Sequence, residues 1–224
     1  MKIEPVAIFR SPISGKFGIP RQAGLAPELQ GTISFIEPFD SPDALRGLEG
    51  FDYLWLIWGF SMNAQSQEFK ATVRPPRLGG NERIGVFASR SPFRPNGLGL
   101  SSVRISQIDF AKGEVHVLGA DLADGTPIYD VKPYIEYADS HPGVRSGFVD
   151  SRSWEPLEVV MPDNIAALFS EADSAALRSI LAQDPRPQYH DDPERIYGLL
   201  FKDMDVRFKV DAETLTVVSV EERK

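Results

Sequence analysis

Short hydrophobic runs separated by turn-forming residues dominate the first two thirds of the chain. Residues 4–12, 31–39 and 51–60 read EPVAIFRSP, GTISFIEPF and FDYLWLIWGF, and Pro, Gly and Asp bound these runs. Runs of this length that are rich in β-branched and aromatic residues are typical of β-strands. Residues 100–110 and 113–122 alternate between apolar and polar positions on either side of a turn, which predicts a β-hairpin.

Only residues 41–51 have helical features in this part of the chain. Ser41 can cap a helix, Pro42 suits the first helical position, and Gly47 or Gly50 can end the helix. Helices therefore do not alternate with strands as they do in a doubly wound parallel sheet. The pattern predicts a mainly β fold built on a small antiparallel β-barrel.

The pattern weakens between residues 138 and 163, where Pro, Gly, Ser and Asp are frequent, and we expect a domain boundary in this stretch. After it, Asp163 or Asn164 can cap a helix over 165–184, where apolar residues recur at helical spacing. Three short strands follow within residues 195–220. The predicted domains are a β-barrel over 1–150 and a small α+β domain, a helix with a β-meander, over 151–224.

The composition is that of an ordinary globular protein, with 42% hydrophobic and 25% charged residues. No stretch approaches the ~18 apolar residues of a membrane span, and the first residues lack the apolar run of a signal peptide. The chain has no cysteine, which excludes disulfides, thiolate metal ligands and cysteine nucleophiles. Its three histidines are too far apart in sequence for a local metal motif. We expect a cytoplasmic protein without a metal.

The charge is distributed unevenly along the chain. The formal net charge is −8, yet residues 69–104 hold six arginines and one lysine against the single carboxylate of Glu82, a local charge of +6. A cationic segment on an acidic body indicates an anion-binding site, because the local field steers a ligand more than the net charge does. The alternative is that each arginine pairs with a carboxylate elsewhere in the fold.

Three loops place arginine beside proline and glycine. Residues 15–24, 72–85 and 89–99 read GKFGIPRQAG, TVRPPRLGGNERIG and SRSPFRPNGLG. Proline lowers the conformational freedom of such a loop, and the planar guanidinium donates two parallel hydrogen bonds to a carboxylate or phosphate. These loops are either anion sites or simple turns between strands.

A fourth stretch, residues 121–139, reads DLADGTPIYDVKPYIEYAD. Its Asp-Gly pair is a strong turn signal, and an extended segment follows in which Ile128, Asp130 and Lys132 share one face. An alternating Asp and Lys pair is more often a solvated face than a catalytic pair.

The familiar nucleotide-binding and hydrolase motifs are absent. The segment GLGLSS, residues 97–102, departs from G-x-G-x-x-G because Ser102 replaces the third glycine, and a strand is predicted after it where a helix is required. This excludes a Rossmann site. The chain has no Walker motif and no G-x-S-x-G elbow with His and Asp partners.

Taken together, five motifs resemble the TsaA-like, TrmO family of S-adenosylmethionine-dependent tRNA (adenine-N6)-methyltransferases. The motifs are FGIPRQAGL, TVRPPRLGG, RIGVFASRSPFRPNGLGLS, DGTPIYDVKPY and LAQDPRPQY, and they occur in the order of the family. The resemblance covers residues 5–140 and 181–220. It implies a small non-Rossmann β-barrel that works as a homodimer. The implied substrate is N6 of threonylcarbamoyladenosine at position 37, next to the anticodon of a threonine tRNA.

The resemblance also implies which residues bind the cofactor, S-adenosyl-L-methionine. Ser61-Met62 stands where the family carries His-Gln, which leaves a backbone contact in place of a side-chain contact, and Gly97 stands where proline is frequent. The implied cofactor contacts are Pro20, Arg21, Gln22, Ser61, Met62, Arg90, Leu100, Asp124, Gly125, Thr126 and Pro127.

The remaining candidate residues follow from the chemistry that this activity needs. An exocyclic adenine amine is a poor nucleophile, so catalysis depends on placing it in line with the methyl–sulfur bond and on an acceptor for its hydrogen. Asp130 and Tyr134 are the catalytic candidates, and Asp124 or Asp130 is a candidate partner for the ammonium group or a ribose hydroxyl. The candidate RNA-binding residues are Arg74, Arg77, Arg83, Arg94 and Lys132.

Two other functions stay open from the sequence. A barrel methyltransferase that acts on a small molecule suits the pI near 5.0 and predicts cofactor binding that tRNA does not affect. A non-catalytic RNA-binding barrel predicts salt-sensitive RNA binding without affinity for S-adenosylmethionine.

Overall fold

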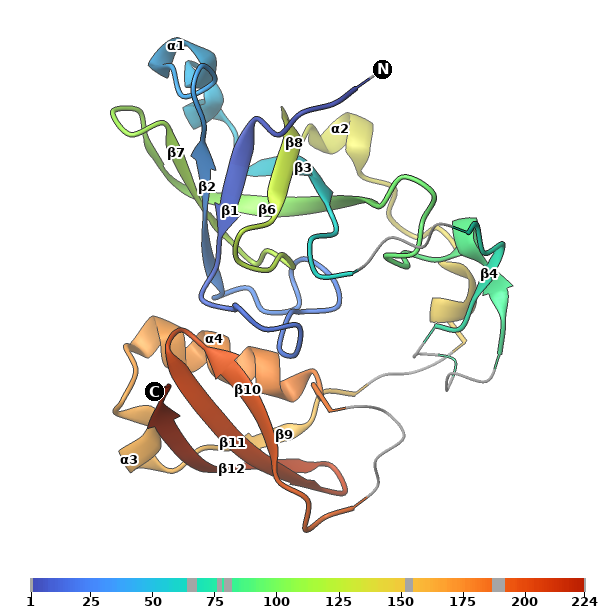
Figure 1. The fold of residues 1–224 in the computed structure, drawn as a ribbon, viewed down its shortest axis with the longest axis vertical. Helices are drawn as coiled ribbons and strands as arrows, with labels where there is room; N and C mark the ends of the chain where they lie inside the picture. The colour runs from blue at the N-terminus through green and yellow to red at the C-terminus, as the bar shows by residue number, and fades with distance from the viewer. Residues whose placement is uncertain are drawn as a thin grey trace.

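The computed structural model describes residues 2–63, 68–75, 78, 82–151, 155–186 and 192–223. Figure 1 shows a barrel and, beneath it, a smaller sheet with helices. The barrel is closed by six strands in the order β1-β2-β7-β6-β3-β8, and every neighbouring pair is antiparallel. The predicted mainly β fold with an antiparallel barrel is confirmed. The strands are β1 Ala7–Arg10, β2 Gln30–Phe35, β3 Tyr53–Gly59, β6 Leu98–Asp109, β7 Glu114–Leu118 and β8 Pro127–Pro133.

Side-chain alternation along β3 explains how the barrel fills its interior. Leu54 and Leu56 are fully buried in the barrel core, while Tyr53 is 43% exposed on the outer wall. Successive residues of a strand point to opposite faces, so one run of apolar residues supplies both the core and an apolar outer surface. The outer surface is therefore part of what the fold presents to a partner.

The predicted helix over 41–51 consists of two short pieces. Helix α1 spans Pro42–Leu45, and the Ser41 hydroxyl accepts from the Asp43 N–H at 3.3 Å, as the cap prediction requires. Gly47, with a φ of 90°, ends α1, and the 3-10 helix η1 follows over Leu48–Gly50. The predicted cap and the predicted stop are both confirmed.

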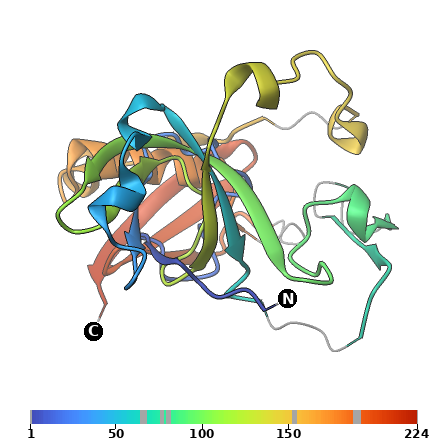
Figure 2. The same ribbon diagram turned by 90° about the horizontal axis from the view of Figure 1, so that it is seen from above.

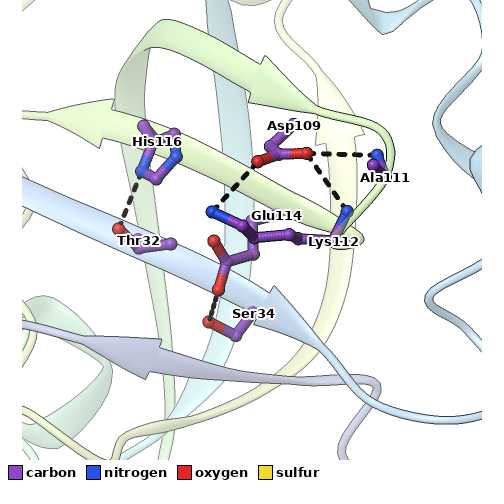
Figure 3. Close-up of polar contacts among 7 residues, drawn as sticks. All are labelled: Thr32, Ser34, Asp109, Ala111, Lys112, Glu114 and His116. Atoms are coloured by element: carbon purple, nitrogen blue, oxygen red, sulfur yellow. Dashed lines mark hydrogen bonds and ion pairs between the residues drawn. The ribbon is translucent and has the colours of Figure 1, made fainter.

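The predicted hairpin is β6–β7, and its turn is held by Asp109 (Figure 3). The Asp109 carboxylate accepts from the Ala111 and Lys112 backbone N–H groups, each at 3.1 Å, and lies 3.3 Å from Lys112 Nζ. Further along the barrel wall, Thr32 Oγ1 lies 3.0 Å from His116 Nδ1 across β2 and β7. The Asp109 contacts lie at the end of β6 that is away from the loop over residues 89–99.

The Asp109 contacts predict a pH dependence of stability. The Lys112 backbone N–H, followed by other contacts of Lys112 and Ala111, holds the pKa of Asp109 below its ordinary value of 3.8, despite an opposing effect of desolvation. A carboxylate with a lowered pKa stabilises the fold above the ordinary value, and this contribution is lost as the pH falls through the lowered value. We expect Asp109→Asn to reduce the difference in thermal midpoint between pH 6 and pH 3. An unchanged difference would show that other carboxylates carry the acid sensitivity.

The C-terminal unit is a four-stranded sheet in the order β10-β11-β12-β9. Strands β10, β11 and β12 form the predicted meander, and β9 adds to it in parallel with β12, which the sequence pattern did not show. The bounds are β9 Glu158–Val160, β10 Tyr197–Phe201, β11 Met204–Asp211 and β12 Thr214–Glu222, with helices α3 Asp163–Ala166 and α4 Glu171–Ala182.

The prediction of one continuous helix over 165–184 is wrong. Helix α3 ends at Ala166, and α4 begins after Ser170, whose hydroxyl accepts from the Asp173 N–H at 3.1 Å. The side chains of Asp163 and Asn164 do not cap α3, because Pro162 occupies the cap position. A serine cap inside an apolar period starts a new helix, which periodicity alone does not reveal.

Residues 11–29, which we call the first loop, pack into the core of the C-terminal unit (Figure 1). Ile13 is fully buried and Leu29 is 2% exposed, both in one hydrophobic cluster with Leu177 and Ile180 of α4. Hydrogen bonds add to this packing: the Gln183 side-chain amide donates to the Leu25 carbonyl at 3.3 Å, and the Ser179 hydroxyl donates to the Glu28 carboxylate at 2.8 Å. The C-terminal unit therefore fixes a loop of the barrel.

Leu29→Ala tests this coupling. Removing a buried leucine side chain costs about 2–5 kcal/mol of unfolding free energy, and we expect the first loop to loosen with it. Leu45→Ala is the matched control, because Leu45 is equally buried at 2% exposure but lies in the barrel core. At a temperature where both variants are folded, calorimetric titration should show weaker S-adenosylmethionine binding for Leu29→Ala alone. Equal affinity of the two variants would contradict the coupling.

The segment between β3 and β6 leaves the barrel as an arm (Figures 1 and 2). Its described elements are β4 Thr72–Val73, β5 Ile84–Gly85 and the 3-10 helix η3 Val86–Ala88, with β4 and β5 paired antiparallel. The short helices α2 Glu136–Asp139 and η4 Gly147–Val149 follow β8. None of the helices in the described ranges has the length and apolar character needed to cross a membrane.

Candidate functional site

The first loop and the segment after β7 are joined by backbone hydrogen bonds at one end of the barrel. The Gly24 N–H donates to the Gly119 carbonyl at 2.8 Å, and the Asp124 N–H donates to the Ile13 carbonyl at 3.0 Å. Two of the predicted cofactor loops, more than ninety residues apart in sequence, are thereby held against each other. These hydrogen bonds fix the position of each loop, so the two loops can support a binding site.

The Asp124–Pro127 turn is fixed from both sides. Asp124 Oδ1 accepts from the Ser11 N–H at 3.0 Å, and Gly125 has a φ of 74°, a conformation that favours glycine. Thr126 is 1% exposed, and its hydroxyl lies 3.1 Å from the Ser61 hydroxyl. The structure thus brings two predicted cofactor contacts, Ser61 and Thr126, together. Met62, the neighbour of Ser61, is half-buried.

The first and third arginine loops also meet. Arg90 Nη1 donates to Gln22 Oε1, and Gln22 Nε2 donates to the Arg21 carbonyl at 2.5 Å. Arg21 points the other way, because its guanidinium donates to the Asp184 carbonyl of the C-terminal unit at 3.2 Å. Pro20, the neighbour of Arg21, is buried. Arg90 and Gln22 are therefore placed for a shared ligand, while the described contact of Arg21 is structural.

A buried polar cluster lies behind these loops. Trp58 Nε1 donates to the Ser101 hydroxyl at 3.0 Å, and that hydroxyl donates to Asp121 Oδ1 at 2.6 Å. Burial raises the pKa of Asp121, and this effect is opposed by the Ser101 hydroxyl, by backbone N–H groups including that of Ala23, and by the charge of Arg90. Asp121 was not among the candidates that the sequence pattern indicated. The only signal was an acidic residue set among apolar ones in LGADLA, three positions before Asp124.

Leu100 and Asp130 lie on one row of the outer wall. Leu100 pairs with Ile57 on β3, and Ile57 pairs with Asp130 on β8. Strands are about 5 Å apart, so Leu100 and Asp130 are separated by about 10 Å across the sheet. Leu100 is 60% exposed, which leaves its side chain available for a ligand or a partner.

Tyr134 lies at the other end of β8 from the Asp124–Pro127 turn. Its N–H donates to the Tyr53 carbonyl at 3.0 Å, and its ring packs at 5.7 Å from the ring of Trp55. Eight residues of extended chain separate it from Thr126, about 26 Å along the strand. Within one subunit the structure does not bring Tyr134 to the cofactor loops.

Four arginines of the cationic segment have no carboxylate partner among the residues that the structure describes. Arg74 and Arg83 are exposed on the arm, and Arg94 donates to the Ser89 carbonyl at 2.6 Å with its guanidinium 6.0 Å from the Phe87 ring centre. Among the residues that the structure describes, no Asp or Glu oxygen lies within 4.0 Å of these three or of Arg90. The alternative was that each arginine of this segment pairs with a carboxylate elsewhere in the fold. These four arginines do not have such a partner among the described residues.

The other RNA-binding candidates give a mixed picture. Lys132 Nζ lies 4.0 Å from Asp130 Oδ2, and both side chains are exposed, so the pair is loose. Arg77 lies outside the described residues, as do residues 187–189 of the fifth motif. Within the described ranges, no group of three or more His, Asp or Glu could hold a metal ion.

A shallow pocket of about 200 Å³ lies between the first loop and α4. It is lined by Lys16, Phe17 and Arg21 on one side and by Ile180, Gln183 and Pro185 on the other. The Gln22–Arg90 contact does not line this pocket, so the two are alternative places for a ligand.

Comparison with known proteins identifies this arrangement. The tRNA-methyltransferase O N-terminal domain matches residues 8–140, and the TrmO C-terminal domain matches residues 155–223. The chain is 37% identical to the tRNA (adenine(37)-N6)-methyltransferase of Escherichia coli over 99% of this chain and 98% of that protein. It is 38% identical to RcsF of Pseudomonas aeruginosa, assigned to the S-adenosylmethionine-dependent methyltransferases, over 92% and 91% of the two chains. The crystal structure of TrmO from Pseudomonas aeruginosa superposes with a TM-score of 0.79 at 31% identity, covering 99% of this chain and 98% of that chain.

The fold and these matches define a β-barrel methyltransferase that depends on S-adenosylmethionine. The chain belongs to the TrmO family, the tRNA (adenine(37)-N6)-methyltransferases. The family, the enzyme class and the cofactor expected from the sequence are confirmed. The individual cofactor, RNA and catalytic residues stay predictions.

The first loop contacts both the loop over residues 89–99 and the Asp124–Pro127 turn, and we call these three segments the loop cluster. The residues of the loop cluster fit S-adenosylmethionine. The cofactor carries a carboxylate, an ammonium and a sulfonium, and the cluster offers an exposed guanidinium at Arg90 and a partly buried carboxylate at Asp121. Charges of both signs placed a short distance apart match a zwitterionic ligand better than a simple anion. The described site has the chemistry that the cofactor requires.

Proposed function

We propose that this chain transfers the methyl group of S-adenosylmethionine to N6 of threonylcarbamoyladenosine at position 37 of a threonine tRNA, as a homodimer in the cytoplasm. Family membership supports the reaction class, and the motif resemblance supports the modified substrate. The observation that carries the proposal is the convergence of predicted cofactor contacts from four loops, shown by the Gln22–Arg90 and Ser61–Thr126 contacts.

In this proposal different loops bind different parts of the cofactor. Arg90 receives the carboxylate of the methionine portion, and Gln22 orients the guanidinium by accepting from it. The rigid Asp124–Pro127 turn and the Ser61 hydroxyl orient the adenosyl portion, since Thr126 is already held by Ser61. Bound S-adenosylmethionine supplies a methyl group on a positively charged sulfur.

A residue of the chain then has to accept the proton that N6 loses. N6 of threonylcarbamoyladenosine carries one hydrogen, and that hydrogen leaves as a proton when the N–C bond forms and the C–S bond breaks. We assign Asp130 as the acceptor, because its carboxylate is loosely paired with Lys132 at 4.0 Å and lies on the same outer row as Leu100. Tyr134 is assigned to positioning the base, which requires the substrate to reach the outer wall beside the contact with the second copy.

The homodimer is supported by the outer wall of β6, β3 and β8. Four apolar or aromatic side chains lie on this outer face of adjacent strands: Tyr53, Trp55, Ile57 and Leu100. Leu100 is 60% and Tyr53 is 43% exposed. Contiguous exposed apolar side chains mark an interaction surface, and a symmetric pair of copies can cover such a face on both. We assign this face to the second copy.

The RNA surface is assigned to the arm. Arg74, Arg83 and Arg94 supply cations, and Phe87 and Phe93 are 72% and 50% exposed beside them. Phosphates take arginine, and unpaired bases of an anticodon loop stack on aromatic rings. The arm thus offers cations for the phosphates and aromatic rings for the unpaired bases of an RNA hairpin loop.

The test is methyl transfer from labelled S-adenosylmethionine to threonine tRNA with and without the threonylcarbamoyl group, followed by digestion to nucleosides. We expect labelled N6-methylated product from the modified tRNA only. Label in unmodified tRNA would contradict the substrate assignment, and cofactor binding with no product from either tRNA would favour a small-molecule methyltransferase. RNA binding without cofactor affinity would favour the non-catalytic barrel.

A further inference from the structure

Asp121 is a carboxylate that the described part of the chain leaves without a cation in contact. Burial raises its pKa, and within the described residues no Lys or Arg nitrogen lies within 4.0 Å of it. Two other partly buried carboxylates are paired closely: Asp184 lies 2.8 Å from Arg186, and Asp173 lies 2.5 Å from Lys202. Burying an unpaired charge is costly, so a persistent one calls for a partner outside the chain.

The position of Asp121 shows where such a partner would come from. Ser101, 3% exposed, and Trp58, 7% exposed, form a buried polar floor on one side of the carboxylate. The Ala23 N–H and the charge of Arg90 act on the same carboxylate from the first and third arginine loops. Asp121 retains partial exposure, so a ligand held by those loops can reach it.

We propose that Asp121 binds the positive charge of the methyl donor, through its ammonium or its sulfonium group, while Arg90 takes the carboxylate of the same molecule. This inference rests on the proposed function, because it requires the loop cluster to be the donor site. The Ser101 hydroxyl holds one carboxylate oxygen at 2.6 Å, which leaves the other oxygen for the ligand. Both charges of the zwitterion are then met by this chain.

Asp121→Asn keeps the shape of the side chain and removes its charge. A charge-assisted hydrogen bond is worth about 1.5–3 kcal/mol, so we expect calorimetric titration to show about 10- to 100-fold weaker S-adenosylmethionine binding. S-adenosylhomocysteine lacks the sulfonium and keeps the ammonium. An equal loss for both ligands assigns the ammonium as the partner, and a loss confined to S-adenosylmethionine assigns the sulfonium.

Proton release gives a readout that a purely structural role would not change. A bound cation favours the ionised carboxylate and lowers the pKa that burial has raised. Binding near that raised pKa must therefore release protons, and affinity must rise as the pH increases through it. Titrations in buffers with different ionisation enthalpies should show this release for the wild-type chain and not for Asp121→Asn.

Stability and a matched control separate this inference from a folding effect. Removing a charge that burial disfavours should leave the thermal midpoint at neutral pH unchanged or raise it. Asp109→Asn removes the same charge at the far end of β6 and should leave cofactor affinity at the wild-type value. If the wild-type chain binds no cofactor, the proposed function fails. If wild type binds, Arg90→Ala weakens binding and Asp121→Asn keeps both affinity and proton release, this inference alone is overturned.

Discussion

Arg90→Ala weakens S-adenosylmethionine binding by at least about 100-fold in this account, and it leaves the thermal midpoint unchanged. Arg90 is exposed, its described side-chain hydrogen bond goes to Gln22, and no described carboxylate lies within 4.0 Å of it. A bidentate guanidinium–carboxylate contact supplies two charge-assisted hydrogen bonds, each worth about 1.5–3 kcal/mol. Removing the guanidinium therefore costs affinity and little stability. Calorimetric titration with S-adenosylmethionine and with S-adenosylhomocysteine measures the loss.

Two further variants show whether the loss comes from the fork of the guanidinium or from its charge. Arg90→Lys keeps the charge without the planar fork and should fall between wild type and Arg90→Ala. Arg46→Ala removes an arginine that is paired with Asp43 beside α1 and should bind the cofactor as wild type does. Wild-type affinity in Arg90→Ala would remove Arg90 from the site.

The second large effect concerns the arm. Exchanging Arg74 and Arg83 together for alanine should weaken threonine-tRNA binding by about 10- to 100-fold and lower the salt slope by about 2, because each phosphate contact contributes about one unit. Both side chains are exposed, and no described carboxylate neutralises them. Fluorescence anisotropy of labelled tRNA measures both quantities between 50 and 200 mM salt. Over this range, a protein that makes about six to ten phosphate contacts loses orders of magnitude in affinity.

The control for the arm removes two cations that already have partners. Arg46 pairs with Asp43, and Lys112 lies 3.3 Å from Asp109, so the double alanine variant changes the net charge equally. Its tRNA affinity and salt slope should match wild type. A salt slope that falls equally in both double variants would mean that tRNA responds to net charge and has no surface on the arm.

The barrel was largely predictable because its signals are local. Strand alternation, the Ser41 cap and the Gly47 stop all act within a few residues, and the structure confirms them. The prediction of one C-terminal helix was wrong for a related reason. The Ser170 cap starts a new helix, although the apolar period continues through Leu168. Leu168 is 56% exposed, so it marks the break between the two helices and does not belong to the core.

The site was predictable only in part, because it is made by contacts between distant loops. Motifs identified Gln22 and Arg90, but nothing in their sequence separation of 68 residues predicts that their side chains meet. The packing of Ile13 and Leu29 in the core of the C-terminal unit is non-local in the same way. Asp121 was missed because its significance lies in what surrounds it in space, and periodicity carries no such information.

A crystal structure of the chain with S-adenosylhomocysteine tests the central claim most directly, because it shows which loops form the cofactor site. The account predicts the ligand carboxylate within hydrogen-bonding distance of the Arg90 guanidinium and the adenosyl portion against the Asp124–Pro127 turn. A ligand bound instead in the pocket between Lys16 and Pro185, with Arg90 and the turn free of contacts, would contradict it.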